Sequence, residues 1–348
     1  MLKKLLFIVV GLCLAGLLTA IVFWEALGWY GDQPVMGPDG NDNLEFIISQ
    51  GESMTAVADS LAELGWLQHP KIFVLLARIE KAAAGIHAGD YLIPAGISHR
   101  ELLKIFTSGQ VRYYNVTLVE GHTLKEVVAA LNQHEKLSSP MDDKALQSLF
   151  KSLAIELNPE GLFFPDTYFF QSGATVESIL RRAYNRMDSV LAEEWGRRAE
   201  GLPYKNPYEA LIMASLVEKE TGVAYERGEI AGVFVRRLQK GMRLQTDPTV
   251  IYGLGDSYKG NISRQMLRRA TPYNTYVIKG LPPTPIAIAG REAIHAALHP
   301  KDGKTLYFVA KGDGTHYFSK TLAEHNRAVR KYQIEQRRED YRSTVETQ

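Results

Sequence analysis

A run of twenty residues without a charged side chain, residues 5–24, constrains this chain more than any other feature. A helix that rises about 1.5 Å per residue would cross the roughly 30 Å hydrocarbon core of a membrane over this length. Lys3 and Lys4 precede the run, so we expect the residues after Trp24 to lie outside the cytoplasm. A cleaved signal peptide is the alternative, but its apolar region usually spans only about 7–15 residues. The sequence therefore predicts a single uncleaved anchor within residues 1–30.

The composition narrows the classes of partner and cofactor. The 348 residues hold 40 basic and 39 acidic side chains, so the net charge of +1 offers no basic excess to neutralise phosphates. Nucleic acid is therefore not an expected partner. The one cysteine, Cys13, lies in the apolar run, which excludes sites built on paired thiolates. His295 and His299 have metal-like spacing but lack the glutamate of a zinc-protease motif between them, so we expect no metal and no cofactor.

A short pattern that links strands to helices recurs four times. Each copy has a glycine, one intervening residue and a serine or threonine ahead of an apolar helical period. A hydroxyl at this place caps free amides in the first turn of a helix, and two copies add the glutamate of a capping box. The pattern predicts an α+β fold after the apolar run. The four copies are Gly51–Ser53, Gly96–Ser98, Gly121–Thr123 and Gly173–Thr175.

Three segments are expected after the anchor. Residues 31–43 are rich in turn formers and predict a linker. Residues 44–110 predict a small βααβ module that resembles LysM, a glycan-binding fold, although a structural cap without ligand affinity is the alternative. Residues 111–345 predict a larger mixed α+β catalytic domain. The expected strands are 44–49, 90–93, 111–118 and 306–309, and the expected helices are 54–64, 70–83, 124–131 and 176–195.

Residues 210–217 are apolar nearly all round, which predicts a buried helix that ends in two glutamates. Glu218 and Glu220 are two positions apart, about 200° around the helix axis, so they face different sides. Small and apolar neighbours one turn before Glu218 would limit its solvation and raise its pKa, which would let it donate a proton near neutral pH. The alternative is a helix-end Glu218 paired with Lys219 or an arginine, and the residues alone favour that alternative.

Two polar stretches further on suit the recognition of sugars. One holds Gln245, Thr246 and Asp247, and the other holds tyrosines and an asparagine at residues 273–276 before the stiff turn at 280–283. Aromatic rings stack on pyranose faces, while amides hydrogen-bond hydroxyl and acetamido groups. An ordinary rigid loop is the alternative.

Several segments, in the same order along the chain, resemble the MltG/YceG family of membrane-anchored endolytic murein transglycosylases. The resemblance covers nearly the whole chain and departs from the family at Thr284, Ile288 and Ala289, which leaves the path of that loop open. The segments are Glu160–Tyr168, Leu216–Thr221, Arg243–Tyr252, Tyr273–Tyr276 with Gly280–Pro283, His299–Pro300, Leu306–Val309 and His325–Asn326.

The resemblance implies which residues form the site. It makes Glu218 the catalytic residue, the general acid and then the base. It places seven further residues at substrate-binding positions around the cleft: Gln245, Thr246, Asp247, Tyr273, Asn274, Tyr276 and Glu160.

The resemblance also implies the activity and the location. The enzyme would cleave the bond between N-acetylmuramic acid and N-acetylglucosamine in nascent peptidoglycan strands and leave 1,6-anhydro ends. It would lie in the bacterial inner membrane as a single-pass protein with its C-terminal domain in the periplasm. Penicillin-binding proteins and other cell-wall synthases are candidate partners. The alternative function is a non-catalytic glycan-binding scaffold that recruits those synthases.

Overall fold

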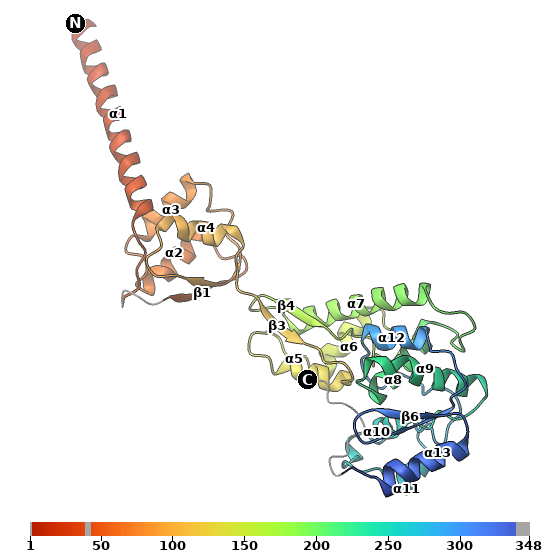
Figure 1. Ribbon diagram of the computed structural model, residues 1–348. Helices are drawn as coiled ribbons and strands as arrows, with labels where there is room; N and C mark the ends of the chain where they lie inside the picture. The colour runs from red at the N-terminus through yellow and green to blue at the C-terminus, as the bar shows by residue number, and fades with distance from the viewer. Residues whose placement is uncertain (1, 39–42, 339–348) are drawn as a thin grey trace. The chain divides into compact units, whose positions relative to one another are not determined.

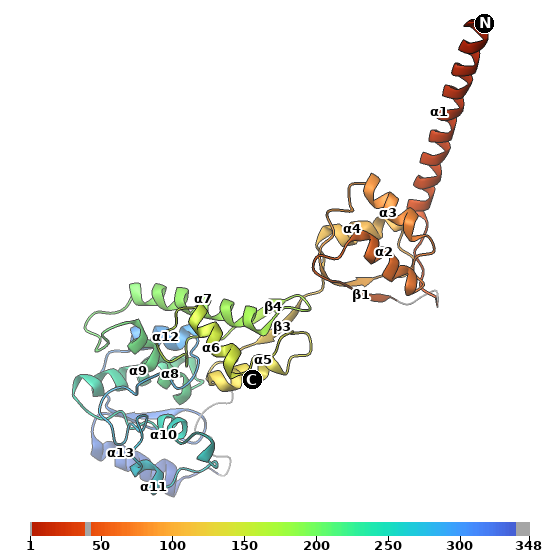
Figure 2. The ribbon, with the colours of Figure 1, turned by 180° about the vertical axis from the view of Figure 1, so that it is seen from behind.

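The computed structural model describes residues 2–38 and 43–338, and these fall into two compact units (Figures 1 and 2). The small unit comprises the chain up to Tyr114 together with Phe169–Gly173, and the large unit comprises Asn115–Tyr168 and the chain from Ala174 on. The boundary falls within strands β3 (Tyr114–Thr117) and β4 (Thr167–Phe170), which pair with each other.

Helix α1 (Leu2–Asp32) carries the apolar run. From Leu6 to Asp32 it is long and apolar enough to cross a membrane, a property that anchors share with signal sequences. Its last turns instead belong to the core of the small unit, where Leu27 and Tyr30 are buried. Asp32 forms an ion pair with Arg100, at 2.7 Å between oxygen and nitrogen. The helix therefore runs without a break from the apolar run into the folded unit.

The small unit has the predicted βααβ order, which is confirmed with end points within four residues. Strands β1 (Leu44–Ile48) and β2 (Gly89–Ile93) pair antiparallel, with Leu44 opposite Ile93. Helices α2 (Met54–Glu63), α3 (Pro70–Ile79) and α4 (His99–Ser108) cover this two-stranded sheet. Their fully buried side chains include Leu61, Phe73, Leu102 and Phe106.

The start of the predicted linker at residues 31–43 differs from the prediction. Residues 31 and 32 belong to α1, and Val35 is buried in the core of the small unit. The backbone of Val35 bonds to Ile97 and Gly96, at 2.7 and 3.0 Å, so this stretch is held like an additional strand. Residues 39–42 of the predicted linker lie outside the described residues.

The four glycine–hydroxyl signals are confirmed as helix starts. Each glycine has a positive φ, between 78° and 82°, which residues with a Cβ rarely adopt. Each hydroxyl is an N-cap that accepts a hydrogen bond from the first helical turn, and Ser98 and Thr123 form complete capping boxes. The capped helices are α2, α4, α5 (Leu124–Asn132) and α7 (Val176–Gly196).

The large unit is built around α8 (Pro207–Glu220), whose residues Ala210 to Val217 are all buried, as predicted. Helices α7, α9 (Ala224–Gln239), α10 (Asp247–Leu254) and α12 (Arg291–Leu298) pack around it (Figure 1). The burial of every face fixes α8 in place, so the residues at its C-terminal end are held rigidly. The unit also contains α6 (Asp143–Ser152), α11 (Arg264–Arg268), α13 (Leu322–Val329), and two short turns of helix at Gly255–Ser257 and Arg330–Glu335.

A two-stranded sheet packs against α9, which also contacts α8 and α12. Strands β5 (Tyr307–Ala310) and β6 (His316–Ser319) pair antiparallel, with Tyr307 opposite Ser319. The segment before β5 is tied to α9 because the Arg236 guanidinium donates to the backbone oxygens of Lys301 and Thr305, both at 2.8 Å. The close approach of this segment to α9 therefore sets the position of β5.

We expect Gly232→Ala to lower the free energy of unfolding by about 1–3 kcal/mol because it overpacks this contact. A Cβ at Gly232 would lie 2.4 Å from the backbone oxygen of Lys301. That clash should outweigh the roughly 1 kcal/mol by which alanine favours a helix over glycine. Thermal unfolding of the full chain in detergent measures the effect.

The matched control is Gly228→Ala, one turn earlier in the same helix. A Cβ there would lie at ordinary contact distances from Lys301, 3.7 Å from its Cβ and 4.0 Å from its backbone nitrogen, so this variant should be as stable as the parent or more so. Equal stability of the two variants would contradict the proposed role of the close contact.

Candidate active site

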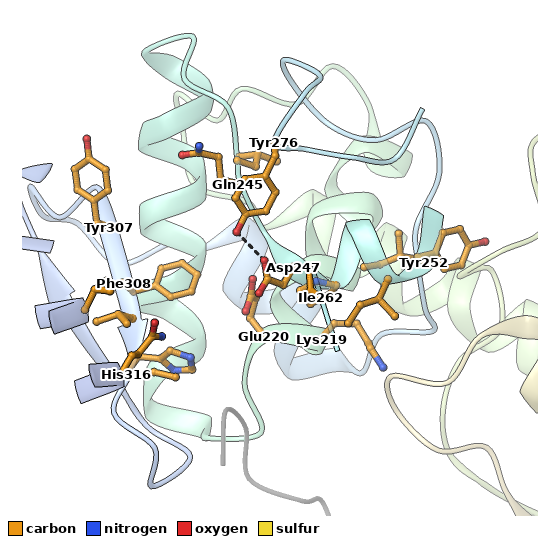
Figure 3. A pocket seen from close by; sticks show the side chains of 18 of the residues that line it. Lys219, Glu220, Gln245, Asp247, Tyr252, Ile262, Tyr276, Tyr307, Phe308 and His316 are labelled. Carbon is orange, nitrogen blue, oxygen red and sulfur yellow. Dashed lines mark hydrogen bonds between the residues drawn. The ribbon is translucent and has the colours of Figure 1, made fainter. Parts of the chain in front are cut away.

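The large unit contains a cavity of about 930 Å³ at the C-terminal end of α8, within the size range of small-molecule sites (Figure 3). The chain after α9 supplies one side, and β5, β6 and α13 supply another. The polar and aromatic side chains on its walls include Lys219, Glu220, Arg237, Gln245, Asp247, Tyr252, Tyr258, Tyr276, Tyr307, Phe308, His316, His325 and Asn326.

Glu220 is the carboxyl group at the centre of this cavity (Figure 3). It is the last residue of α8, and the hydroxyl of Thr246 donates a hydrogen bond to its Oε1. The pKa of Glu220 is raised to about 7, chiefly by burial. The charge of Asp247 contributes to the rise, while the hydrogen bond from Thr246 and the charge of Arg237 oppose it. A carboxyl group with this pKa holds its proton for much of the time at neutral pH and can donate it.

A buried cluster of threonines fixes the position of Thr246, whose hydroxyl group bonds to Glu220. Thr246, Thr249 and Thr275 are each no more than 1% exposed. The hydroxyl groups of Thr249 and Thr275 lie 2.9 Å apart, and the Thr275 hydroxyl accepts from the Thr246 backbone at 3.0 Å. Gln245, the preceding residue, has φ of 55°, an uncommon conformation for a residue other than glycine that is often found at functional sites.

Two further contacts organise the polar side of the cavity. The hydroxyl of Tyr276 donates to Oδ1 of Asp247 at 2.6 Å, drawn as the dashed line in Figure 3. Burial, followed by the charge of Asp247, raises the pKa of Tyr276, so the phenol stays protonated. Arg237 donates to the backbone oxygens of Leu244 and Leu306, at 2.7 and 2.6 Å, and so joins the two sides of the cavity.

The opposite wall contains a buried pair of a histidine and a carboxylate. His316 lines the cavity, and its Nδ1 lies 2.8 Å from Oε2 of Glu226. The backbone amide of His316 donates to the other oxygen of Glu226 at 2.9 Å. Both side chains are only 4% exposed. The pair fixes the orientation of the imidazole on the cavity wall.

Glu218, the residue predicted to be catalytic, is not among the residues that line this cavity. Its side chain is 6% exposed and faces the start of α12, where the backbone amide of Gly290 donates to Oε2 at 3.0 Å. The pKa of Glu218 is raised to about 7, chiefly by burial. The charges of Glu120 and Glu292 contribute to the rise, while the Gly290 amide and the charge of Arg227 oppose it. Arg227 lies 3.8 Å from Glu218 and also pairs with Glu292. This is close to the alternative weighed from the sequence, a glutamate paired with an arginine.

Glu160 does not line the cavity but bonds to a residue that does. It is 6% exposed, and its Oε1 accepts from the backbone amide of Leu124, the first residue of α5. Its Oε2 accepts from the hydroxyl of Tyr252, which does line the cavity, at 3.0 Å. Tyr273 stacks edge-on against Tyr252, with 4.8 Å between ring centroids, and its hydroxyl lies 3.0 Å from that of Thr284.

Asn274 holds the backbone together rather than lining the cavity. The residue is 1% exposed, and its side-chain amide donates to the backbone oxygens of Met266, Leu267 and Arg269, the last at 2.7 Å. Its own side-chain oxygen accepts from the backbone amide of Tyr276 at 2.9 Å. Asn274 thereby connects α11 to the segment that positions Tyr276.

The predicted residues thus divide into two groups. Gln245, Asp247 and Tyr276 line the cavity, and the Thr246 hydroxyl group donates a hydrogen bond to Glu220. Glu160, Tyr273, Asn274 and Glu218 lie outside the lining.

Sequence reasoning did not indicate that Glu220, Arg237 and His316 line the cavity. Glu220 lies in the same motif as Glu218, so the motif could have indicated it. No pattern around Arg237 or His316 distinguishes them before the fold is known.

A second group of side chains has the geometry of a metal site. Ligand atoms of Glu194, His295 and His299 lie within 4.8 Å of one another, beside a separate cavity of about 460 Å³. The two oxygens of Glu194 already bond to Arg291 at 2.8 Å and to His295 at 2.9 Å. These bonds link α7 to α12, and the group is separate from the cavity that Glu220 lines.

Comparison with known proteins places this arrangement in a family. An endolytic murein transglycosylase of Bacillus subtilis is 33% identical over 313 residues, which is 84% of this chain and 86% of the relative. A Streptococcus pneumoniae protein of the same name is 26% identical over 353 residues; these cover 90% of this chain but 63% of the longer relative. The crystal structure of a YceG-like protein from Listeria monocytogenes, 29% identical, superposes with a TM-score of 0.53 and covers 82% of this chain and 99% of its own.

The match to a family description extends over both units. Residues 46–331 match the YceG-like family, a stretch that includes the βααβ unit and every residue that lines the large cavity except Gln333. The chain belongs to the YceG-like family.

Proposed function

We propose that this protein is an endolytic murein transglycosylase and that Glu220 transfers the proton. The observation that carries the proposal is a carboxyl group with a pKa of about 7 in the wall of a cavity of about 930 Å³. Family membership and the names of the relatives supply the substrate class, peptidoglycan.

The reaction needs one group that first gives and then takes a proton. Protonated Glu220 donates its proton to the glycosidic oxygen as the bond from that oxygen to C1 of N-acetylmuramic acid breaks. The resulting carboxylate accepts the proton of the C6 hydroxyl of the same sugar, and O6 bonds to C1. The products are a strand with a 1,6-anhydro end and a strand with a free C4 hydroxyl, and no water is consumed.

The neighbours of Glu220 fit this cycle. The Thr246 hydroxyl stabilises the carboxylate after the first step, and Asp247 and burial favour the return of the proton. Tyr252, Tyr258 and Tyr276 offer ring faces to pyranoses, and Gln245 offers an amide to their polar groups.

The choice between Glu218 and Glu220 follows from access. Both carboxyl groups have a pKa of about 7, so the pKa does not separate them. Glu220 lines the cavity together with Gln245, Asp247 and Tyr276, whereas Glu218 bonds to the backbone at the start of α12. We therefore assign the proton transfer to Glu220 and a supporting role at the start of α12 to Glu218, the residue that the sequence predicts.

The other units have proposed roles in the same function. Helix α1 acts as an uncleaved anchor in the bacterial inner membrane, with both folded units in the periplasm. Its continuity with the core of the small unit supports this role. The βααβ unit acts as a LysM-like module that holds the glycan strand, in keeping with its element order. Penicillin-binding proteins and other cell-wall synthases are the proposed protein partners.

The central test compares Glu220→Gln with Glu218→Gln. Glu220→Gln keeps the shape but removes the transferable proton, and it should lower the rate of 1,6-anhydro product formation by about 10²–10⁴-fold or more. Glu218→Gln keeps an acceptor for the Gly290 amide and should retain most of the activity. The measurement is mass spectrometry of products from purified glycan strands, with melting temperatures of both variants as the control.

Two outcomes would change the assignment. Loss of activity in Glu218→Gln at unchanged stability, with an active Glu220→Gln, would restore Glu218 as the acid. Binding of glycan without any anhydro product from the parent protein would favour the non-catalytic scaffold.

The pH dependence gives an independent test. The acid must be protonated, so activity should fall as the pH rises through about 7. Because the pKa is raised in the folded state, ionisation of Glu220 costs stability, which declines between about pH 4.5 and 7. Relative to the parent, Glu220→Gln should therefore gain stability above pH 7, at most about 3 kcal/mol, and gain none below pH 4. Chemical unfolding at pH 4 and pH 8 checks this; a constant difference would count against the raised pKa.

The anchor proposal makes a topological prediction. A reporter that is active only outside the cytoplasm, fused after Gln348, should be active, and the protein should stay in the membrane fraction with its N-terminus intact. Recovery of a mature soluble form that begins near Ala20 would show that the apolar run is a signal sequence.

A further inference from the structure

One continuous stretch of the large unit is basic and contains no carboxylate. Residues 257–291 lack aspartate and glutamate, although acidic and basic residues are nearly equal in number in the whole chain. The cations of the stretch are Lys259, Arg264, Arg268, Arg269, Lys279 and Arg291.

The first part of this stretch forms a wall of the large cavity. Tyr258, Gly260, Asn261 and Ile262 line it, and α11, with its two arginines, follows directly. Ile262 lies on the same side of the cavity as Lys219 and Tyr252 in Figure 3. Residues 258–269 are called the basic wall below.

The cations of the basic wall are exposed and lack counter-ions. Lys259, Arg264, Arg268 and Arg269 form no ion pair with any of residues 2–38 and 43–338. Other arginines of the large unit differ, since Arg227 and Arg237 are buried and bonded. Four unpaired cations on one short stretch make its surface locally positive. The four cations do not themselves line the cavity; they follow or interrupt the lining residues 258 and 260–262 along the chain.

The basic wall is held in place rather than left as a free loop. Ser263 caps α11, accepting from the backbone amide of Met266 at 3.2 Å. The buried Asn274 then holds three backbone oxygens at the end of α11, as described above. The arginines thus start from a fixed backbone, which reduces the entropy lost when they bind.

We propose that the basic wall binds the carboxylates of the peptides attached to the glycan strand. The inference rests on the proposed function. Each N-acetylmuramic acid of peptidoglycan carries a short acidic peptide on its lactyl group. A sugar bound beside Glu220 would direct that peptide out of the cavity, past its walls. The planar guanidinium groups of Arg264 and Arg268 match carboxylates in bidentate geometry.

An anionic lipid surface is the other partner that such charges attract. The peptide is favoured because residues 258 and 260–262 of the basic wall line the substrate cavity and the arginines follow them directly along the chain. The basic wall also lacks the large exposed apolar side chains that insert into a membrane.

The test compares peptide-bearing glycan strands with the same strands stripped of peptides by an amidase. The full chain in detergent is used as the parent and as the double variant Arg264→Gln/Arg268→Gln. The matched control is Lys144→Gln/Lys240→Gln, which removes the same charge from exposed sites outside the cavity. Rates of anhydro product formation give kcat/KM for each strand.

We expect the parent to prefer peptide-bearing strands by about threefold to tenfold at low salt, and less as salt screens the charges. The double variant should lose this preference while cleaving stripped strands normally, and the control should keep it. An unchanged preference in the double variant, or an equal loss on both strands, would overturn the proposal.

Binding separates this inference from the proposed function. In a Glu220→Gln background, the Kd for both strand types is measured with and without the double substitution. A loss of affinity confined to peptide-bearing strands supports the basic wall even if the parent protein cleaves nothing. If the substitution instead weakens binding only to vesicles that contain anionic lipid, the basic wall contacts a membrane and the proposal fails.

Discussion

The burial of α8 on every side is the constraint on which the site depends. Residues Ala210 to Val217 have no exposed face, so the helix cannot rotate or shift without opening the core of the large unit. Its C-terminal end therefore presents Glu220 to the cavity at a fixed place, and the threonine cluster fixes the hydroxyl that bonds to it. Burial of the Glu220 carboxyl group in the cavity wall raises its pKa.

Local structure was readable from the sequence where local chemistry determines it. The four glycine–hydroxyl signals mark helix starts because a positive φ and a cap are properties of a few neighbouring residues. The βααβ order and the buried helix follow from apolar periodicity in the same way. Residues 31–38 were misjudged because turn formers also occur in packed backbone, where Val35 pairs with Ile97 through contacts distant in sequence.

Which of the predicted site residues line the cavity depends on tertiary geometry, which the sequence does not reveal. The helical wheel correctly separates Glu218 from Glu220, yet it does not tell which side faces a cavity and which faces another helix. The tertiary fold decides which glutamate faces the cavity. The backbone amide of Gly290, the N-cap of α12, donates a hydrogen bond to Glu218, whereas Glu220 lines the cavity together with Gln245 and Asp247. Glu160 and Asn274 show the same limit. Each belongs to a motif that resembles the family, but their side chains bond to the backbone of Leu124 and Met266 and do not line the cavity.

The continuous helix at the N-terminus has a mechanical consequence. Because Leu27 and Tyr30 are built into the core of the small unit and Asp32 is paired with Arg100, no flexible joint separates the apolar run from that unit. A force on the small unit would therefore be transmitted to the apolar helix as a change in the direction of its axis.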